Sequence, residues 1–201
     1  MEMLSPDKIN ALSAIVERAL GEAAAVFSEM VNQEIQIDVP KVAMVPLKSI
    51  ADEAGGPEHV GAGIYMGLAG DGNGHVILFF SEPSTYQLLD LILEVEPGTT
   101  QSLGEIELSA LAELGNVTGS SFLNHLADQT NLELLPTTPA VALDMLGAIL
   151  SSVLADLATS GSQALLVETK FRSGDKKSVS GYFFLLPQPQ SLLLISDRLK
   201  G

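Results

Sequence analysis

Four polar side chains recur at helical spacing in the second half of the chain: Ser109, Glu113, Asn116 and Ser120. At 3.6 residues per turn, steps of 4, 3 and 4 place them in one narrow stripe of a helix over 105–130. The stripe combines a carboxylate, which only accepts hydrogen bonds, with a carboxamide, which both donates and accepts them. It is either a functional site or the solvated face of an amphipathic helix, and spacing alone leaves both interpretations open.

The residues on both sides of this stripe are apolar or small, so we expect the helix to be packed along most of its girth. Gly115 and Gly119 lie in the apolar sector, where each costs about 1 kcal/mol of helix stability relative to Ala. Their position predicts that another backbone approaches the helix closely.

The sequence offers few other reactive groups. Cysteine is absent, which excludes disulfides, thiol nucleophiles and cysteine-based metal sites. His59, His75 and His125 share no metal-ligand spacing, and we predict no metal site. The glycines of segment 70–74 lie between two strand patterns without a lysine or a following helix, which indicates a hairpin turn rather than a phosphate-binding loop. No Gly-x-Ser-x-Gly element is present.

Composition narrows the choice of partners. The 201 residues are 46% hydrophobic and 17% charged, which is enough apolar material for one well-packed domain. Acidic residues outnumber basic ones 25 to 10, and no Lys or Arg occurs between Lys48 and Lys170. Nucleic acids and anionic membranes are bound by clustered Lys and Arg, so we expect neither as a partner. The apolar windows are short and the first residues carry charges, which favours a cytoplasmic protein.

The elements that must position the polar stripe follow from hydrophobic periodicity and turn residues. In the first half, Ser5 and Pro6 indicate the start of a long helix. The predicted order is helix 9–31, strands 34–39 and 42–47, a loop at 51–57, strands 61–69 and 75–81, and a helix from Pro83 to Ile92.

The second half has a similar order. It predicts helix 105–130, a short strand at 132–135, helix 141–158, strand 164–171, a turn at 173–175, strand 179–186 and helix 188–199. We therefore predict an α+β fold with a largely antiparallel central sheet and two long helices packed on it.

The matching order predicts an internal duplication within a single domain of residues 1–201. A shift of 99 residues places Pro40 on Pro139 and helix 9–31 on helix 108–130. The two halves, about 5–98 and about 103–201, would then be related by a pseudo-twofold axis. Their sequence identity is low, and two unrelated α+β halves are the alternative.

The stripe also belongs to a longer pattern. Ser109-x3-Glu113-x2-Asn116, followed after 22 residues by Pro139, resembles the signature of the CheC/CheX/FliY phosphatases of bacterial chemotaxis. The surrounding segments 112–116, 135–139, 144–149 and 167–169 look like those of CheC, as do residues 32–46. The resemblance covers nearly the whole chain, and the length of the chain favours CheC over the shorter CheX.

The resemblance implies a hydrolase that removes the aspartyl phosphate of the response regulator CheY. Asn116 would orient a water for in-line attack on phosphorus, and Glu113 would pair with a lysine of the receiver domain. Ser109 and Pro139 would support the motif structurally. Because residues 49–169 include no Lys or Arg, Mg²⁺ and lysine would come from the receiver, and the chain would need no cofactor of its own.

The first half departs from the family pattern. The same shift of 99 residues places Asn10, Ala14 and Glu17 at the motif positions, while Pro40 still matches. Ala14 cannot form an ion pair, and Glu17 brings a negative charge where a neutral amide is needed. We therefore predict one active site, on helix 105–130.

The resemblance also implies that the deamidase CheD binds this chain, although no residue marks such a surface. A different class of function remains open, namely a non-enzymatic adaptor that binds CheY-phosphate, CheD or the flagellar switch. The first motif, which lacks the acid and the amide, is consistent with an adaptor. The intact second motif favours the phosphatase.

Overall fold

The computed structural model describes residues 5–157, 163–173 and 178–199. The helices and strands, in chain order, are α1 (Pro6–Met30), β1 (Gln36–Pro46), the 3-10 turn η1 (Leu47–Ser49), α2 (Ile50–Glu53), β2 (Val60–Gly70), β3 (Gly74–Ser81), α3 (Glu82–Ile92), α4 (Glu105–Thr130), β4 (Leu134–Pro136), β5 (Ala140–Met145), α5 (Leu146–Leu157), β6 (Gln163–Arg172), β7 (Val179–Pro187) and α6 (Pro189–Arg198).

The strands form one antiparallel sheet in the order β1-β6-β7-β3-β2-β4. Strand β5 pairs with the first half of β2, and β4 pairs with its last residues. The predicted α+β class with a largely antiparallel sheet is confirmed. Each outer strand pairs with an inner strand of the opposite half, since β1 lies on β6 while β4 and β5 lie on β2. This order is what two exchanged, related halves would produce, and the duplication itself stays a prediction.

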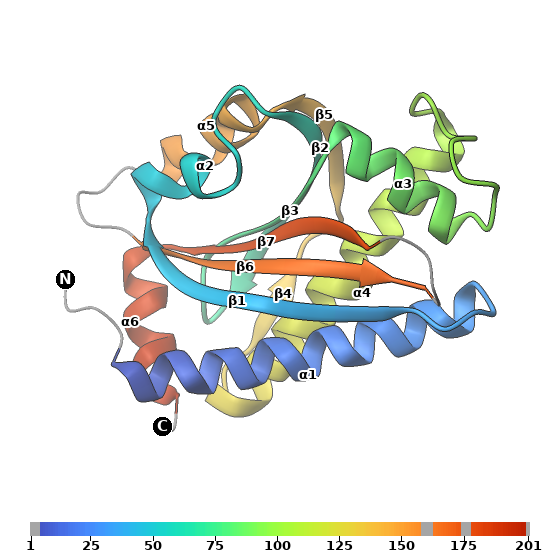
Figure 1. Cartoon of the computed structure of the whole chain (residues 1–201). Coiled ribbons are helices and arrows are strands. Elements are labelled where there is room, and N and C mark those ends of the chain that lie inside the picture. The colour runs from blue at the N-terminus through green and yellow to red at the C-terminus, as the bar shows by residue number, and fades with distance from the viewer. Residues whose placement is uncertain (1–4, 158–162, 174–177, 200–201) are drawn as a thin grey trace.

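Helices lie on both faces of the sheet (Figure 1), and one apolar cluster of buried side chains lies on each side of it. Helices α1, α3, α4 and α6 pack on one face, where the two long helices α1 and α4 were expected. The two long helices also lie against each other. The other face is covered by α2 and α5. None of the described helices has the length and apolar character needed to span a membrane.

The first helix begins as its sequence indicates. The Ser5 hydroxyl accepts a hydrogen bond from the Lys8 N–H at 3.4 Å, and Pro6 occupies the first turn, where no intrahelical donor is needed.

Three of the sequence-based boundaries are wrong. Segment 141–145, predicted as the start of a helix, is strand β5, because β2 exposes an edge over Val60–Tyr65 that this segment pairs with. Residue 158, the predicted end of that helix, lies outside the described residues. Strand β1 runs through Pro40 without a break, since β1 is an edge strand and Pro there needs no ladder donor. The predicted loop 51–57 contains the end of α2.

The pairing of β1 with β6 shifts register between Asp38 and Lys41, beside Pro40. The hairpin turn at Gly70–Gly74 forms as predicted between β2 and β3. Most of the predicted turn at 173–175 lies outside the described residues.

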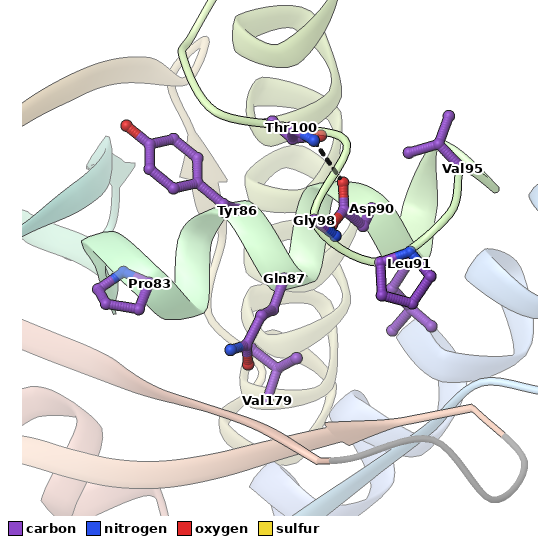
Figure 2. A pocket seen from close by; sticks show the side chains of 10 residues that line it. Pro83, Tyr86, Gln87, Asp90, Leu91, Val95, Gly98, Thr100 and Val179 are labelled. Carbon is purple, nitrogen blue, oxygen red and sulfur yellow. Dashed lines mark hydrogen bonds between the residues drawn. The ribbon is translucent and has the colours of Figure 1, made fainter.

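The connection between α3 and α4 is held by one buried carboxylate. Asp90 is 5% exposed, and its two oxygens accept hydrogen bonds from the N–H groups of Gly98 at 2.6 Å and Thr100 at 2.8 Å (Figure 2). Burial alone would raise the pKa of Asp90, but the hydrogen bonds from Thr100 and Gly98 outweigh it and lower the pKa below its ordinary value of 3.8. Asp90 thus fixes the chain a few residues before α4 begins.

Asp90→Asn should lower the free energy of unfolding at pH 7 by roughly 1–3 kcal/mol, because an amide cannot accept both hydrogen bonds and one buried N–H loses its partner. Folding lowers the pKa of Asp90, so the ionised carboxylate stabilises the native protein relative to Asp90→Asn. This extra stability is fully present above the ordinary pKa of 3.8 and is lost as the pH falls through the pKa of Asp90 in the folded protein. Urea unfolding of both proteins between pH 7 and pH 2 measures this. A stability difference that stays constant over the whole range would show that Asp90 ionisation is not involved.

Candidate active site

The polar stripe predicted from the sequence lies on the solvent side of α4. Ser109, Glu113 and Asn116 are all exposed, whereas Leu111 and Leu114 between them are fully buried. The α4 helix begins after Gly104, whose N–H donates to the Glu107 carboxylate at 2.9 Å. Capping and an apolar inner face therefore present the three motif side chains on consecutive turns.

The glycines of α4 set its distance from the sheet. A Cβ placed on Gly115 would overlap the Cγ2 methyl of Ile64, and one on Gly119 would overlap the terminal methyl of Met66. Ile64 and Met66 both belong to β2 and are completely buried. Close approach is confirmed, but the groups that meet the glycines are β2 side chains and not a backbone, as the sequence had suggested.

The second wall of the site is the connection between β4 and β5. Thr137 is bound twice to β2: its N–H donates to the Gly67 carbonyl at 2.9 Å, and its hydroxyl accepts from the Gly67 N–H at 2.8 Å. Pro139 lies beside α4, because its Cβ would be 3.8 Å from a Cβ on Gly115. Thr137 and Pro139 thus hold segment 136–139 against the helix.

Helix and loop together enclose a groove of about 390 Å³. It is lined by Ser109, Ala112, Glu113 and Asn116 from α4 and by Pro136, Thr137, Thr138 and Pro139 from the loop. The structure therefore brings together all four motif residues singled out in the second half. The sequence analysis did not identify Thr137 and Thr138 as site residues. Two adjacent hydroxyl side chains directly before Pro139 could have indicated them.

The counterpart in the first half is arranged differently. Asn10, Ala14 and Glu17 are exposed on α1, as the shift of 99 residues predicts. Pro40, however, lies within the continuous strand β1, whereas Pro139 follows a loop that interrupts pairing with β2 between β4 and β5. The first half therefore lacks the loop wall, in addition to the acid and amide of the motif.

The groove is lined by one acidic side chain and by no basic one. Glu113 carries the negative charge, and the sequence between Lys48 and Lys170 places no Lys or Arg on α4, β4 or β5. The described residues include no group of three or more His, Asp or Glu side chains arranged to hold a metal ion. None of the residues that line the groove is Lys, Arg or His, so the lining itself offers no positive charge.

A larger hollow of about 640 Å³ lies between α3 and the connection to α4 (Figure 2). Its lining includes Pro83, Tyr86, Leu91, Val95 and Val179 and is mainly apolar. None of the motif residues borders it, so the hollow and the groove are separate features.

Gly115→Ala should destabilise the protein by about 1–3 kcal/mol, because the Cγ2 methyl of buried Ile64 cannot move aside easily. Gly119→Ala is the matched control: the overlapping atom is the end of the flexible Met66 side chain, and better helix propensity offsets the clash. Thermal unfolding of the two variants measures the difference. Equal unfolding temperatures would show that the helix-to-sheet distance does not depend on Gly115.

Comparison with known proteins agrees with this geometry. The model of the CheC-like family matches residues 106–143, which contain the stripe on α4, the loop wall and most of β5. The CheY-P phosphatase CheC of Bacillus subtilis (strain 168) is 28% identical over 191 residues, which cover 94% of this chain and 91% of that protein.

Solved structures show the same fold. FliY of Thermotoga maritima matches with a TM-score of 0.80 at 17% identity and covers 98% of both chains. The FliM middle domain of H. pylori matches with a TM-score of 0.72 at 12% identity over 98% of this chain and 100% of that chain. A chain of the CheX–CheY–BeF3–Mg²⁺ complex from Borrelia burgdorferi matches with a TM-score of 0.53 at 19% identity over 87% of this chain and 97% of that chain. In sequence the chain is similar to the CheC-like family over residues 106–143 and to CheC over most of its length, and it shares its fold with FliY and with a chain of the CheX–CheY complex.

Proposed function

We propose that this protein hydrolyses the aspartyl phosphate of a CheY-like response regulator, and that the reaction takes place at the groove between α4 and segment 136–139. The observation that carries the proposal is the exposed pair Glu113 and Asn116, one turn apart at the lip of that groove. The name of the Bacillus relative, a CheY-P phosphatase, and the CheX–CheY complex among the structural neighbours support the substrate class.

Asn116 is the proposed catalytic residue. Its carboxamide can accept a hydrogen bond from a water and donate another, and it adds no charge beside an anionic phosphoryl group. A water held in line with the acyl-phosphate bond attacks phosphorus, the bond to the aspartyl oxygen breaks, and phosphate and a free carboxylate are formed. A carboxylate at position 116 would be repelled by the phosphoryl oxygens.

Glu113 is the proposed anchoring residue. A carboxylate exposed one turn before Asn116 can pair with a lysine of the receiver and fix the register of the two proteins. Phosphoryl transfer also needs charge neutralisation, which segment 49–169 of this chain cannot supply. The receiver's own Mg²⁺ and lysine would provide it, so no cofactor is assigned to this protein.

The second candidate function is a non-enzymatic adaptor. The similarity to FliM middle domains, one of them in a FliG–FliM complex, favours a role in binding at the flagellar switch. The exposed pair Glu113 and Asn116 suits the phosphatase better, since an adaptor has no need of an amide beside an acid at the groove. Binding of CheD and a cytoplasmic location are further proposals that the similarity to CheC suggests.

Asn116→Ala should reduce the decay of the receiver's acyl phosphate to the rate of the receiver alone, because no group then orients the attacking water. Binding of the receiver should change little. Asn124→Ala, which removes an exposed amide two turns further along α4, is the control and should keep native activity. Loss of ³²P label from the receiver measures the decay rate with each of the two variants. If native protein does not speed the decay of the receiver's acyl phosphate, the result would favour the adaptor.

Glu113→Ala should weaken receiver binding by about 30-fold or more, because truncating one partner of an interfacial charge pair costs about 2–5 kcal/mol. Asp128→Ala removes an exposed carboxylate about 22 Å along the same helix and should leave the affinity unchanged. Titration of the receiver loaded with BeF3 and Mg²⁺ gives the dissociation constants. Equal affinity of native protein and Glu113→Ala would exclude the proposed ion pair.

A further inference from the structure

The groove is bordered by apolar side chains that the fold leaves uncovered. Of the large apolar side chains that are exposed among the described residues, five lie at this corner of the molecule: Val60, Ile106, Leu108, Leu143 and Met145. Their exposed fractions range from 38% for Leu108 to 69% for Ile106. Scattered apolar residues are normal on a protein surface, whereas a group of them beside a polar site is typical of an interface.

Sheet register shows that three of the five share one face. Val60 pairs with Met145 and Ala62 with Leu143 in the ladder between β2 and β5, and Ile64, two residues further on, points to α4. Side chains at alternate positions lie on the same face of a sheet. Val60, Leu143 and Met145 therefore point to the side of the sheet that carries α4.

Helix geometry brings the fourth residue to the same place. Gly115 lies over Ile64 and Gly119 over Met66, so α4 and β2 run in the same direction. Leu108 is two turns before Gly115 and about 10 Å nearer the start of the helix, on the same side. By this geometry Leu108 lies towards the beginning of β2, the end of the strand that carries Val60. We call Val60, Leu108, Leu143 and Met145 the apolar shelf.

The shelf and the motif form one continuous surface. Ser109 follows Leu108 directly, and Ala112 lies between the shelf and Glu113 and lines the groove. Ile106 is also exposed, on the side of the polar stripe that faces away from Leu108. A macromolecule that places a reactive group at Asn116 can therefore contact the shelf with the surface around that group.

We infer that the apolar shelf is the docking surface for the receiver domain whose phosphoryl group reaches Asn116; this inference rests on the proposed function. The fitting partner presents apolar side chains next to its acyl phosphate and carries basic groups around them. Charge supports this choice, because the exposed carboxylates of Glu105 and Glu113 on α4 lie beside the shelf and segment 49–169 has no Lys or Arg.

A second copy of this chain fits the shelf poorly. Its net charge is also −15, and a twofold contact would bring Glu105 and Glu113 of each copy towards the same carboxylates of the other. The flexible thioether of Met145 suits a surface that is covered in the complex and exposed without it.

The test replaces the edge-strand part of the shelf. Leu143→Thr with Met145→Thr keeps strand propensity and removes apolar contact area. The full chain is assayed with the CheY protein of the same organism, as KM for its phosphorylated form and as Kd for its form loaded with BeF3 and Mg²⁺. We expect both constants to rise about tenfold.

Leu193→Gln is the matched control, since Leu193 is 52% exposed on α6, away from the groove, and its substitution should leave KM and Kd unchanged. Leu108→Gln repeats the test on the helix and keeps it decisive if the double variant does not fold, which thermal unfolding shows. A rise in KM for this variant supports the shelf equally.

Native KM and Kd in the shelf variants would overturn the inference while leaving the phosphatase intact. Native protein that neither binds the receiver nor speeds its dephosphorylation would instead overturn the proposed function. Sedimentation that shows a native dimer, separated into monomers by Leu143→Thr with Met145→Thr, would assign the shelf to a second copy and overturn the inference as well.

Discussion

The close packing of α4 on β2 is the contact on which the rest of the site depends. Two positions without a Cβ let the helix settle on Ile64 and Met66, and this contact fixes both the rotation and the height of α4 above the sheet. Because the buried side of the helix is determined in this way, the opposite side has to present Glu113 and Asn116. These two side chains are therefore placed by the helix itself and stay exposed to a partner.

The exchange of outer strands between the halves gives this contact its rigidity. The strand that carries Ile64 is paired on one side with β3 and on the other with β4 and β5, which follow α4 in the chain. Helix and loop wall are therefore both attached to the same strand, the helix through side chains and the loop through Thr137 and Gly67. Separating the two walls would require breaking pairs within the sheet.

Much of this arrangement could be predicted from residue types. Helical spacing identified the exposed stripe, Ser5 and Pro6 marked the start of α1, and the glycines of 70–74 located a hairpin. Strand β5 could not be recognised, because its apolar residues continue directly into those of α5 and only the unpaired edge of β2 makes the segment a strand. The passage of β1 through Pro40 depends likewise on its place at the sheet edge. Thr137 acts through a backbone partner 70 residues away, a relation that no local pattern contains.

The lack of basic residues between Lys48 and Lys170 has a consequence for the end of the reaction. In the proposed mechanism, this protein contributes no group that attracts the phosphate ion once it is formed, and the neighbouring carboxylates repel it. Inorganic phosphate would therefore leave without being retained, and ordinary cellular concentrations of it would not occupy the groove. For the same reason, the groove lining offers no basic side chain to the phosphates of sugar phosphates and nucleotides, which would favour a protein substrate over small metabolites.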